Sequence, residues 1–486
     1  MKSRNAFAAS LFALLLALLA GQTLAEAQPA ELSVLTAIEK DGRIFFGGYL
    51  SRGYFRQPVL GVVKGGEVTL LALPGAGAIL SVKPTPQGAV GFGFMVGEGW
   101  VPQAVAVLLN YDNSYAAFSV SANASFYGVD GIALDEDELI LTGYVYASHY
   151  AGDSDVLSIR LSSSGLVKTY ACYGSLGYPD LPRRVLRSGS LIVLVGETWA
   201  YNVSQSDVLV LVLDEGLRVK ASYAVGGAGA ETPEDAIVVD GDLVVVGTTT
   251  SDGYSGFAVR VSDVGGLVWL RSFKGFGSTF LVSVDYAGGV LKALGMTEVE
   301  EGVKVPVLLT LSEKYGWSFE LSRVEVLEAD NFKLMPVSAR GGALFLWGNN
   351  SLFRVKDGAG KAWSMHPLNT TQLELLNHSQ LAVSMERALY GWRSIPGIVE
   401  EKPCNVLLSV RPLEPTVTTF KWRETSLKVV AGEYKSKVEL GTLVQRWLER
   451  NVPLLLLSPA LVIFASLILA AFRRRRSYPK AVHVYR

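Results

Sequence analysis

The sequence contains few of the residues on which most catalytic and metal-binding sites are built. Its 486 residues include two cysteines and four histidines. It has no Cys-x-x-Cys pair and no His-x-x-x-His spacing, the usual signatures of protein zinc sites. A Gly-x-Ser-x-Gly nucleophile motif and an Asp-x-Asp-x-Asp-Gly calcium loop are also missing. The sequence therefore predicts no catalytic residue, no metal site and no cofactor.

The chain also lacks an excess of charge of either sign. Its net charge is −1, charged residues make up 18% of the sequence, and hydrophobic residues make up 49%. Nucleic-acid binding needs a clustered basic surface, so no nucleic-acid partner is expected. This composition predicts a large folded core rather than a disordered chain.

Two cysteines are too few for a disulfide framework in a chain of this length. Cys172 falls in the third of the repeats described below, and Cys404 falls in the last. Repeats so far apart in a ring would not bring the two Cα atoms within about 7 Å of each other. Two unpaired thiols are therefore predicted.

Both ends of the chain carry membrane-targeting patterns. Residues 1–25 combine early positive charge, an apolar stretch and small residues near Ala25, which predicts a cleaved signal peptide. Residues 452–472 are apolar and long enough to cross a bilayer of about 30 Å. Four arginines follow directly and place the tail, residues 473–486, in the cytoplasm. We expect a single-pass protein of the cell membrane with an extracellular N-terminal domain.

Between these ends, a short apolar run ending in glycine returns at a nearly constant interval. These seven marker glycines are Gly48, Gly93, Gly143, Gly196, Gly247, Gly295 and Gly348. A fixed period near 50 residues indicates a repeat architecture. Short β-rich runs bounded by glycine turns, with no room for crossover helices, indicate antiparallel meanders of four strands. The predicted fold is an all-β propeller.

Eight blades are expected over residues 33–433, with seven as the alternative. The expected first strand of the repeat unit can be followed through eight copies, which begin near Val59, Val105, Val156, Val208, Phe257, Val307, Leu352 and Val406. The eighth unit has no marker glycine and could be a degenerate blade or an appended hairpin. Strands from both ends of the domain are expected to complete one blade and so remove the exposed sheet edges. A stalk helix at residues 434–451 would then lead to the transmembrane helix.

Three repeats share a further pattern. Asp155-Val156-Leu157 is followed by Tyr173-Gly174, and Asp207-Val208-Leu209 is followed by Val225-Gly226-Gly227, with Gly247-Thr248-Thr249 in the next unit. The pattern resembles the SBBP-type β-propeller repeat of bacterial and archaeal surface proteins. The resemblance implies a propeller on a cell envelope, and it brings no catalytic residues with it.

The loops that follow the marker glycines are rich in aromatic residues and should emerge on one face. The candidate ligand-binding residues are Tyr54, Trp100, Tyr146, Tyr150, Trp199, Tyr201 and Tyr254. Aromatic rings supply large contact areas at low entropic cost and could stack on sugars or grip an extended peptide. The competing interpretation is that these rings pack back onto their own hairpins.

We therefore expect a membrane-anchored cell-surface propeller that serves as a binding, adhesion or envelope scaffold module for a glycan, a peptide or a protein. The alternative is an extracellular enzyme, either a hydrolase or a quinone-dependent dehydrogenase, because a fold alone does not define a function. An enzyme should bring carboxylates or histidines together at the channel mouth, whereas a binding module should spread aromatic groups over the face.

Overall fold

The computed structural model describes residues 31–146, 154–175, 177–200, 205–263, 265–329, 333–364, 372–389, 392–397, 399–402, 408–421 and 423–433. The predicted signal peptide (1–25), stalk (434–451), transmembrane segment (452–472) and tail (473–486) lie outside these residues. Within the described ranges, no helix has the length and apolar character needed to span a bilayer.

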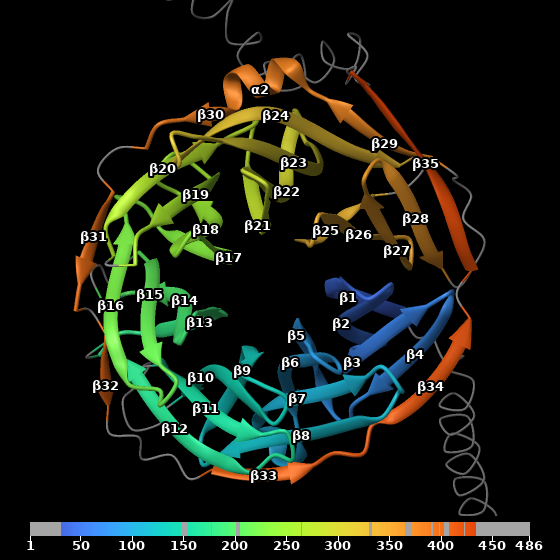
Figure 1. Ribbon diagram of the computed structural model, residues 1–486, viewed down its shortest axis with the longest axis vertical. Coiled ribbons are helices and arrows are strands. Elements are labelled where there is room, and N and C mark those ends of the chain that lie inside the picture. The colour runs from blue at the N-terminus through green and yellow to red at the C-terminus, as the bar shows by residue number, and fades with distance from the viewer. Residues whose placement is uncertain are drawn as a thin grey trace, which may run out of the picture. The chain divides into compact units, whose positions relative to one another are not determined.

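Seven antiparallel meanders of four strands follow one another along the chain and surround a common axis (Figure 1). Blades 1 to 4, each from its innermost strand outward, are β1 (Glu31–Lys40), β2 (Arg43–Arg52), β3 (Phe55–Lys64), β4 (Glu67–Ala72); β5 (Ala76–Thr85), β6 (Gly88–Val96), β7 (Pro102–Asn110), β8 (Tyr115–Ala122); β9 (Ser125–Ala133), β10 (Glu138–Tyr146), β11 (Ser154–Ser162), β12 (Val167–Gly174); and β13 (Asp180–Ser188), β14 (Leu191–Thr198), β15 (Asp207–Asp214), β16 (Val219–Gly226). A short 3-10 turn, η1 (Glu98–Trp100), lies between β6 and β7.

Blades 5 to 7 are β17 (Glu231–Val239), β18 (Asp242–Thr249), β19 (Ser255–Val261), β20 (Leu267–Phe273); β21 (Thr279–Ala287), β22 (Val290–Glu300), β23 (Val303–Lys314), β24 (Ser318–Ala329); and β25 (Met335–Arg340), β26 (Ala343–Gly348), β27 (Ser351–Lys356), β28 (Ala359–Ser364). The described chain is therefore a seven-bladed β-propeller.

The expectation of eight blades is wrong, and the alternative of seven is confirmed. Each marker glycine lies in the second strand of one blade, so the seven glycines count the blades. The copies that begin near Val59 and Val105 are third strands, β3 and β7, rather than first strands. Blade 1 is complete from β1 to β4, and the C-terminal strand at residues 416–421 joins its sheet as an outer fifth strand rather than as one of the four strands of the blade.

Both faces of each blade are covered by neighbouring blades, which explains the long apolar runs in the sequence. In β15, seven consecutive residues from Asp207 to Leu213 are buried, whereas a half-exposed strand would alternate. Seven hydrophobic clusters lie between successive blades, and the cluster that joins blade 7 to blade 1 includes Phe46, Val59, Phe345 and Leu352. The ring therefore closes by side-chain packing of the same kind that joins every other pair of blades.

The last described part of the chain, between residues 372 and 433, runs back around the outside of the ring. It begins with β29 (Gln372–Asn377) on blade 6 and a short helix, α2 (Ser379–Met385). It then adds β30 (Glu386–Arg387), β31 (Arg393–Pro396), β32 (Glu400–Lys402), β33 (Leu408–Pro412), β34 (Thr416–Lys421) and β35 (Arg423–Glu433) to blades 5, 4, 3, 2, 1 and 7. Figure 1 shows this belt in orange and red as a fifth, outermost layer.

The belt closes on itself. β35 pairs antiparallel with β28 of blade 7 and parallel with β29, so the end of the belt lies beside its start. Every belt strand covers the outer edge of a blade, which would otherwise present unpaired backbone groups to another chain. The unit expected to form an eighth blade is therefore neither a blade nor a hairpin module but the greater part of this belt.

The belt also corrects the prediction of two free thiols. Cys172 in β12 is disulfide-bonded. It pairs in register with Lys402 of β32, and Cys404, the only other cysteine of the sequence, lies outside the described residues, two positions further along the chain. The prediction assumed that distant repeats stay apart in a ring. It failed because the C-terminal segment passes every blade in turn.

Six of the seven marker glycines face a bulge in the innermost strand of their blade, whereas the bulge of blade 7 lies opposite Leu346 rather than Gly348. The register between β9 and β10 shifts at Gly143, and equivalent shifts occur in the first two strands of every other blade. A Cβ atom on Gly143 would lie 1.9 Å from the backbone oxygen of Tyr127. Corresponding atoms on Gly48, Gly93, Gly196, Gly247 and Gly295 would approach backbone oxygens just as closely. Glycine is needed at these positions because a bulge brings one strand against the other.

Replacing Gly143 with alanine is therefore expected to lower the free energy of unfolding by about 2–3 kcal/mol, since backbone rather than a flexible side chain would have to move. Gly432 is a matched control because the nearest atom to its added Cβ is a side-chain carbon 3.5 Å away. Chemical denaturation should show a large loss for Gly143→Ala and almost none for Gly432→Ala. Equal effects of the two changes would contradict this role of the bulge.

Candidate functional site

One face of the propeller carries the loops that join second to third strands, together with the connections between blades. Successive strands of a blade run in opposite directions, so these loops emerge at the same end of every blade. The short turns that join first to second and third to fourth strands lie at the other end. We call the first end the loop-rich face.

Four of the predicted aromatic residues stand on the surface at this face. The exposed fraction is 108% for Tyr54, 87% for Trp100, 60% for Tyr254 and 49% for Tyr146. Trp199 is half-buried, and its backbone amide donates to the Pro179 oxygen at 3.2 Å. Tyr150 and Tyr201 lie outside the described residues. Tyr54 and Trp100 are too exposed to be packed back onto their own hairpins, whereas Tyr146 contacts Tyr144 of its own strand. The ligand-binding role of these residues stays a prediction.

Three of these rings follow a glycine in the left-handed region of backbone space. The φ angles are 61° at Gly53, 78° at Gly99 and 63° at Gly253. Trp100 and Tyr254 themselves have φ angles of 62° and 50°. A residue with a side chain pays about 1–2 kcal/mol for this conformation, which therefore needs support from the surrounding loop. The sequence signal for this conformation is a repeated glycine–aromatic pair.

A second group of aromatic residues was missed because its members lie inside strands. Tyr127 of β9 and Tyr144 of β10 are cross-strand partners whose rings stack with centroids 5.0 Å apart. Phe94 packs edge-on against Tyr127 at 5.4 Å, and Tyr146 packs against Tyr144 at 6.3 Å. This aromatic ladder runs from blade 2 to the exposed end of β10. Burial raises the pKa of Tyr144, and Arg183 of blade 4 partly opposes the shift, so charge lies close to the ladder.

Charged side chains of blades 4 and 5 face this region. Arg183 and Glu197 form an ion pair at 2.6 Å, and the Thr232 hydroxyl donates to Glu197 at 3.4 Å. Glu234 is half-buried, and burial raises its pKa against the opposing effect of Arg183 and Arg184. The combination of stacked aromatic rings and hydrogen-bonding charges is typical of sites that hold polar ligands.

At mid-depth, the seven bulges place one polar residue from each blade at the centre of the ring. These residues are Thr36, Ser81, Asp130, Arg184, Asp235, Ser283 and Ser338. They were not predicted because they come from seven different blades, and only closure of the ring brings them together. Five of them lie twelve residues before a marker glycine, and this spacing is the signal that could have identified them.

Asp235 organises this centre. It is fully buried and lies 3.0 Å from Arg184 and 2.5 Å from Arg340. The Ser283 hydroxyl and the Val284 amide donate to its other oxygen at 2.8 and 2.9 Å. Burial alone would raise the pKa of Asp235, but the two guanidinium groups outweigh it and hold the pKa well below its usual range. This carboxylate therefore stays ionised and ties blades 4, 5, 6 and 7 together.

A pair of carboxyl groups lies at the rim between blades 4 and 5. Glu231 is fully buried and accepts hydrogen bonds from the Thr249 and Ser251 hydroxyls at 2.8 and 2.9 Å. Asp207 is buried beside it, and a Cβ on Gly226 would touch both carboxyl groups. Burial raises the pKa of Glu231 to about 7 and that of Asp207 to about 6. The two groups therefore hold a proton at pH values where free carboxyls have lost theirs.

The pH dependence of stability follows from this pair. The pKa of Glu231 rises from 4.5 to about 7 on folding, so between these values the folded state binds more protons than the unfolded state. The free energy of unfolding should fall as pH rises through this window, by about 2–3 kcal/mol. Glu231→Gln should flatten the dependence and be more stable than the wild type at pH 8. Denaturant titrations at pH 5 and 8 test this, with the exposed Glu67→Gln as control. A wild-type protein that gains stability towards pH 8 would contradict it.

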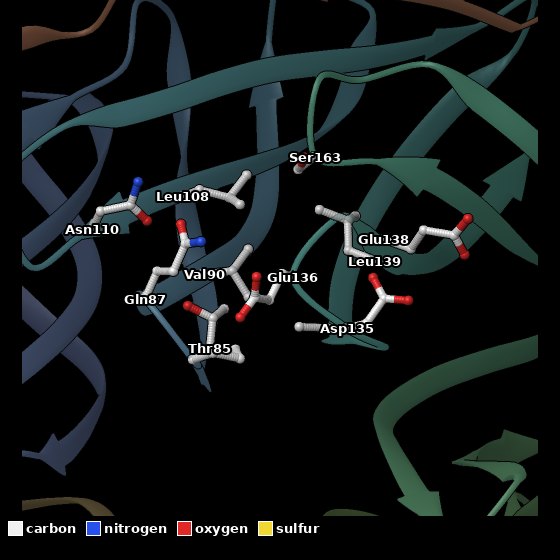
Figure 2. A pocket seen from close by; sticks show the side chains of 12 residues that line it. Thr85, Gln87, Val90, Leu108, Asn110, Asp135, Glu136, Glu138, Leu139 and Ser163 are labelled. Carbon is white, nitrogen blue, oxygen red and sulfur yellow. The ribbon is translucent and has the colours of Figure 1, made fainter.

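A small crevice lies on the opposite face. Figure 2 shows a crevice between the turns of blades 2 and 3, with Thr85, Gln87 and Asn110 on one side and Asp135, Glu136 and Glu138 on the other. Its volume is about 20 Å³. Glu138 is already paired with Arg160 and with Lys168, the latter at 3.5 Å. Nowhere in the described chain do three or more histidine, cysteine or acidic residues come together in a way that could hold a metal ion.

Fold and site together define a β-propeller of the binding or scaffold class, with an aromatic loop face and an ion-paired centre. No protein-family model matches the chain, and no curated protein matches its sequence.

Proposed function

We propose that this protein is an exported binding module, tethered to the cell membrane, whose loop-rich face engages a glycan, a peptide or another envelope protein. One observation carries the proposal: Tyr54 and Trp100, on neighbouring blades, expose nearly all of their surface. Trp100 also holds a left-handed backbone conformation, the cost of which ligand contact would offset.

Export and anchoring are supported by independent features. Residues 1–25 have the pattern of a signal peptide, and residues 452–472 have that of a transmembrane segment followed by arginines. Cys172 is disulfide-bonded, and such bonds persist mainly in oxidising compartments outside the cytosol. The repeat pattern that resembles SBBP-type surface proteins agrees with the same location.

An extracellular hydrolase is the second candidate, and the raised pKa values of Asp207 and Glu231 favour it. Perturbed carboxyl groups are frequent in catalytic sites. However, Glu231 is fully buried, and its oxygens already accept hydrogen bonds from Thr249, Ser251 and the Gly227 amide. A substrate could reach it only by displacing these partners, so the binding module is the better-supported function.

The test is a glycan and peptide array probed with the full-length protein in a detergent that has no sugar headgroup. Trp100→Ala should weaken binding of any array ligand at least about tenfold, the loss expected when a central aromatic contact is removed. Trp317→Ala is the matched control, because Trp317 is 51% exposed in a turn of the opposite face.

The outcomes separate the candidates. Equal binding by the wild type and both Trp100→Ala and Tyr54→Ala would refute the role of the loop-rich face. Loss of binding with Trp317→Ala alone would place the ligand on the other face. Steady turnover of a sugar or peptide substrate that is abolished in Glu231→Gln would establish the enzyme instead.

A further inference from the structure

The innermost strands of blades 4 and 5 carry a pair of charges that the other blades do not repeat. Each bulge leaves one residue without a cross-strand partner, one position nearer the loop-rich end than the central polar residues. In five blades this residue is apolar: Leu35, Leu80, Val129, Val282 and Val337. In blade 4 it is Arg183, and in blade 5 it is Glu234. The inner rim is therefore asymmetric, with its charged groups gathered on two neighbouring blades.

Arg183 and Glu234 place a hydrogen-bond donor next to an acceptor. Two N–H groups of Arg183 donate to Oε1 of Glu197, at 2.9 and 2.6 Å, and a guanidinium has further N–H groups to offer. The Arg183 side chain is 39% exposed. Glu234 is half-buried on the next blade, and the charge of Arg183 acts on its carboxyl group. Both groups are thus partly open to a ligand at this rim.

The aromatic ladder of blades 2 and 3 adjoins this charged pair. The rings of Tyr127 and Tyr144 are nearly parallel, with an angle of 15° between their planes and centroids 5.0 Å apart. Phe94 packs edge-on against Tyr127, and Tyr146, which is 49% exposed, packs edge-on against Tyr144. Burial raises the pKa of Tyr144 and the charge of Arg183 opposes the shift, so the guanidinium lies close to the rings. Apolar ring surface and hydrogen-bonding charges therefore meet at one place.

These contacts restrict the chemistry of a ligand. An anion is disfavoured because Arg183 is already paired with Glu197 and faces Glu234 as well. A cation held by aromatic residues needs ring faces directed at it, whereas Tyr127 and Tyr144 direct one face at each other. A ligand with a flat apolar face and neutral groups that both donate and accept hydrogen bonds suits both halves of the rim. The pyranose ring of a neutral sugar has this combination.

We propose that the inner rim of blades 2 to 5 binds a neutral glycan, with one pyranose ring stacked on the Tyr127–Tyr144 pair and its hydroxyl groups hydrogen-bonded to Arg183 and Glu234. This inference rests on the proposed function, because it names the ligand class of the same loop-rich face. Tyr146 continues the ladder to the exposed end of β10, so a longer glycan extends from the rim past this ring onto the loops.

The test is binding of the full-length protein, in a detergent that has no sugar headgroup, to a panel of neutral hexose oligosaccharides, acidic oligosaccharides and peptides. Tyr144→Ala should weaken binding of a neutral oligosaccharide at least about tenfold, because the stacking ring is lost. Tyr144→Phe keeps the ring and should bind like the wild type. Tyr286→Ala is the matched control: Tyr286 is a half-buried tyrosine packed against Phe319 at 6.1 Å, near the opposite end of the innermost strand of blade 6. It should leave binding unchanged.

A measurement on the wild type does not depend on the folding of a variant. In saturation-transfer difference NMR, the C–H protons on one face of the bound sugar should receive the strongest transfer, because they face the aromatic rings. Equal transfer to all ring protons would contradict stacking. Binding of peptides alone, or of acidic oligosaccharides alone, would overturn the ligand class but leave a binding module. Glycan binding that is lost in Trp100→Ala and unchanged in Tyr144→Ala would uphold the proposed function and overturn this subsite. No binding of any of these probes would overturn both.

Discussion

Replacing Asp235 with asparagine is expected to lower the free energy of unfolding by about 3–5 kcal/mol, the loss measured when one partner of a buried ion pair is removed. The change leaves Arg184 and Arg340 at the centre of the ring without the carboxylate they share. It also weakens the acceptor for the Ser283 hydroxyl and the Val284 amide. Denaturant titration at pH 7 gives the measurement.

The control is Glu39, a carboxylate that also has two cationic partners but is more exposed to solvent than Asp235. Glu39 contacts Arg354 at 2.8 Å and Lys356 at 3.2 Å, and its side chain is 19% exposed. Glu39→Gln should cost no more than about 1 kcal/mol because solvent screens such pairs. The double change Asp235→Asn with Arg340→Met should recover part of the loss. Similar losses for Asp235→Asn and Glu39→Gln would show that the centre is not a low-dielectric site.

The Asp235 carboxylate also makes the free energy of unfolding depend on pH. The pKa of Asp235 is held below its unfolded value of about 3.9, so its contribution to stability is complete above that pH. It should decline as the solution is acidified through and below pH 4. Glu231 acts in the opposite direction and over a higher pH range. The stability maximum should therefore lie between about pH 4 and 5.

The repeat could be predicted from the sequence because it depends on local geometry. In blades 1 to 6 a glycine is required where the second strand lies against a bulge, and these six glycines recur at a steady interval. Gly348 continues the interval in blade 7, although Leu346 faces the bulge there. The number of strands in each blade could also be predicted, because short apolar runs are separated by glycine turns along the chain. Gly348 was the last of the seven, and the absence of an eighth marker was the evidence against an eighth blade.

The belt could not be predicted in the same way. Its strands β33 and β34 have the residue types of any other strand, and β-propensity does not specify a partner. Their partners, β8 and β4, lie about 300 or more residues earlier in the chain. Periodicity alone therefore predicted an eighth blade in a segment that instead pairs with the outer strands of the other blades. The prediction of two free thiols failed for the same reason, because it assumed that each repeat contacts only its neighbours in the ring.

The candidate site was predicted in part. Loop aromatic residues such as Trp100 could be recognised in the sequence because they follow a marker glycine and interrupt the β-rich pattern. The aromatic ladder was not visible, since Tyr127 and Tyr144 occur at ordinary strand positions and meet only through cross-strand pairing. The central ion pairs were hidden for a similar reason: Arg184, Asp235 and Arg340 come from three blades, and only closure of the ring brings them together.

Loss of the disulfide is the second change with a large expected effect. Cys172 is bonded, and Cys404 is the only partner that the sequence offers, more than 200 residues away. A crosslink that closes so long a loop restricts the unfolded chain, and its removal is expected to cost about 4–5 kcal/mol. The bond fastens the belt to blade 3 at one of its shortest strands, β32, where three residue pairs join it to β12.

Cys172→Ser should therefore lower the unfolding midpoint strongly, and reduction of the wild type should have the same effect. Hydrogen exchange should increase first in β12 and β32, because the belt loses its covalent attachment there before the blades separate. The reductant should not change the midpoint of Cys172→Ser, which makes that variant the control for side effects of reduction. A fully reduced wild type with an unchanged midpoint would mean that backbone pairing alone holds the belt, and that the crosslink is not what keeps this segment around the ring.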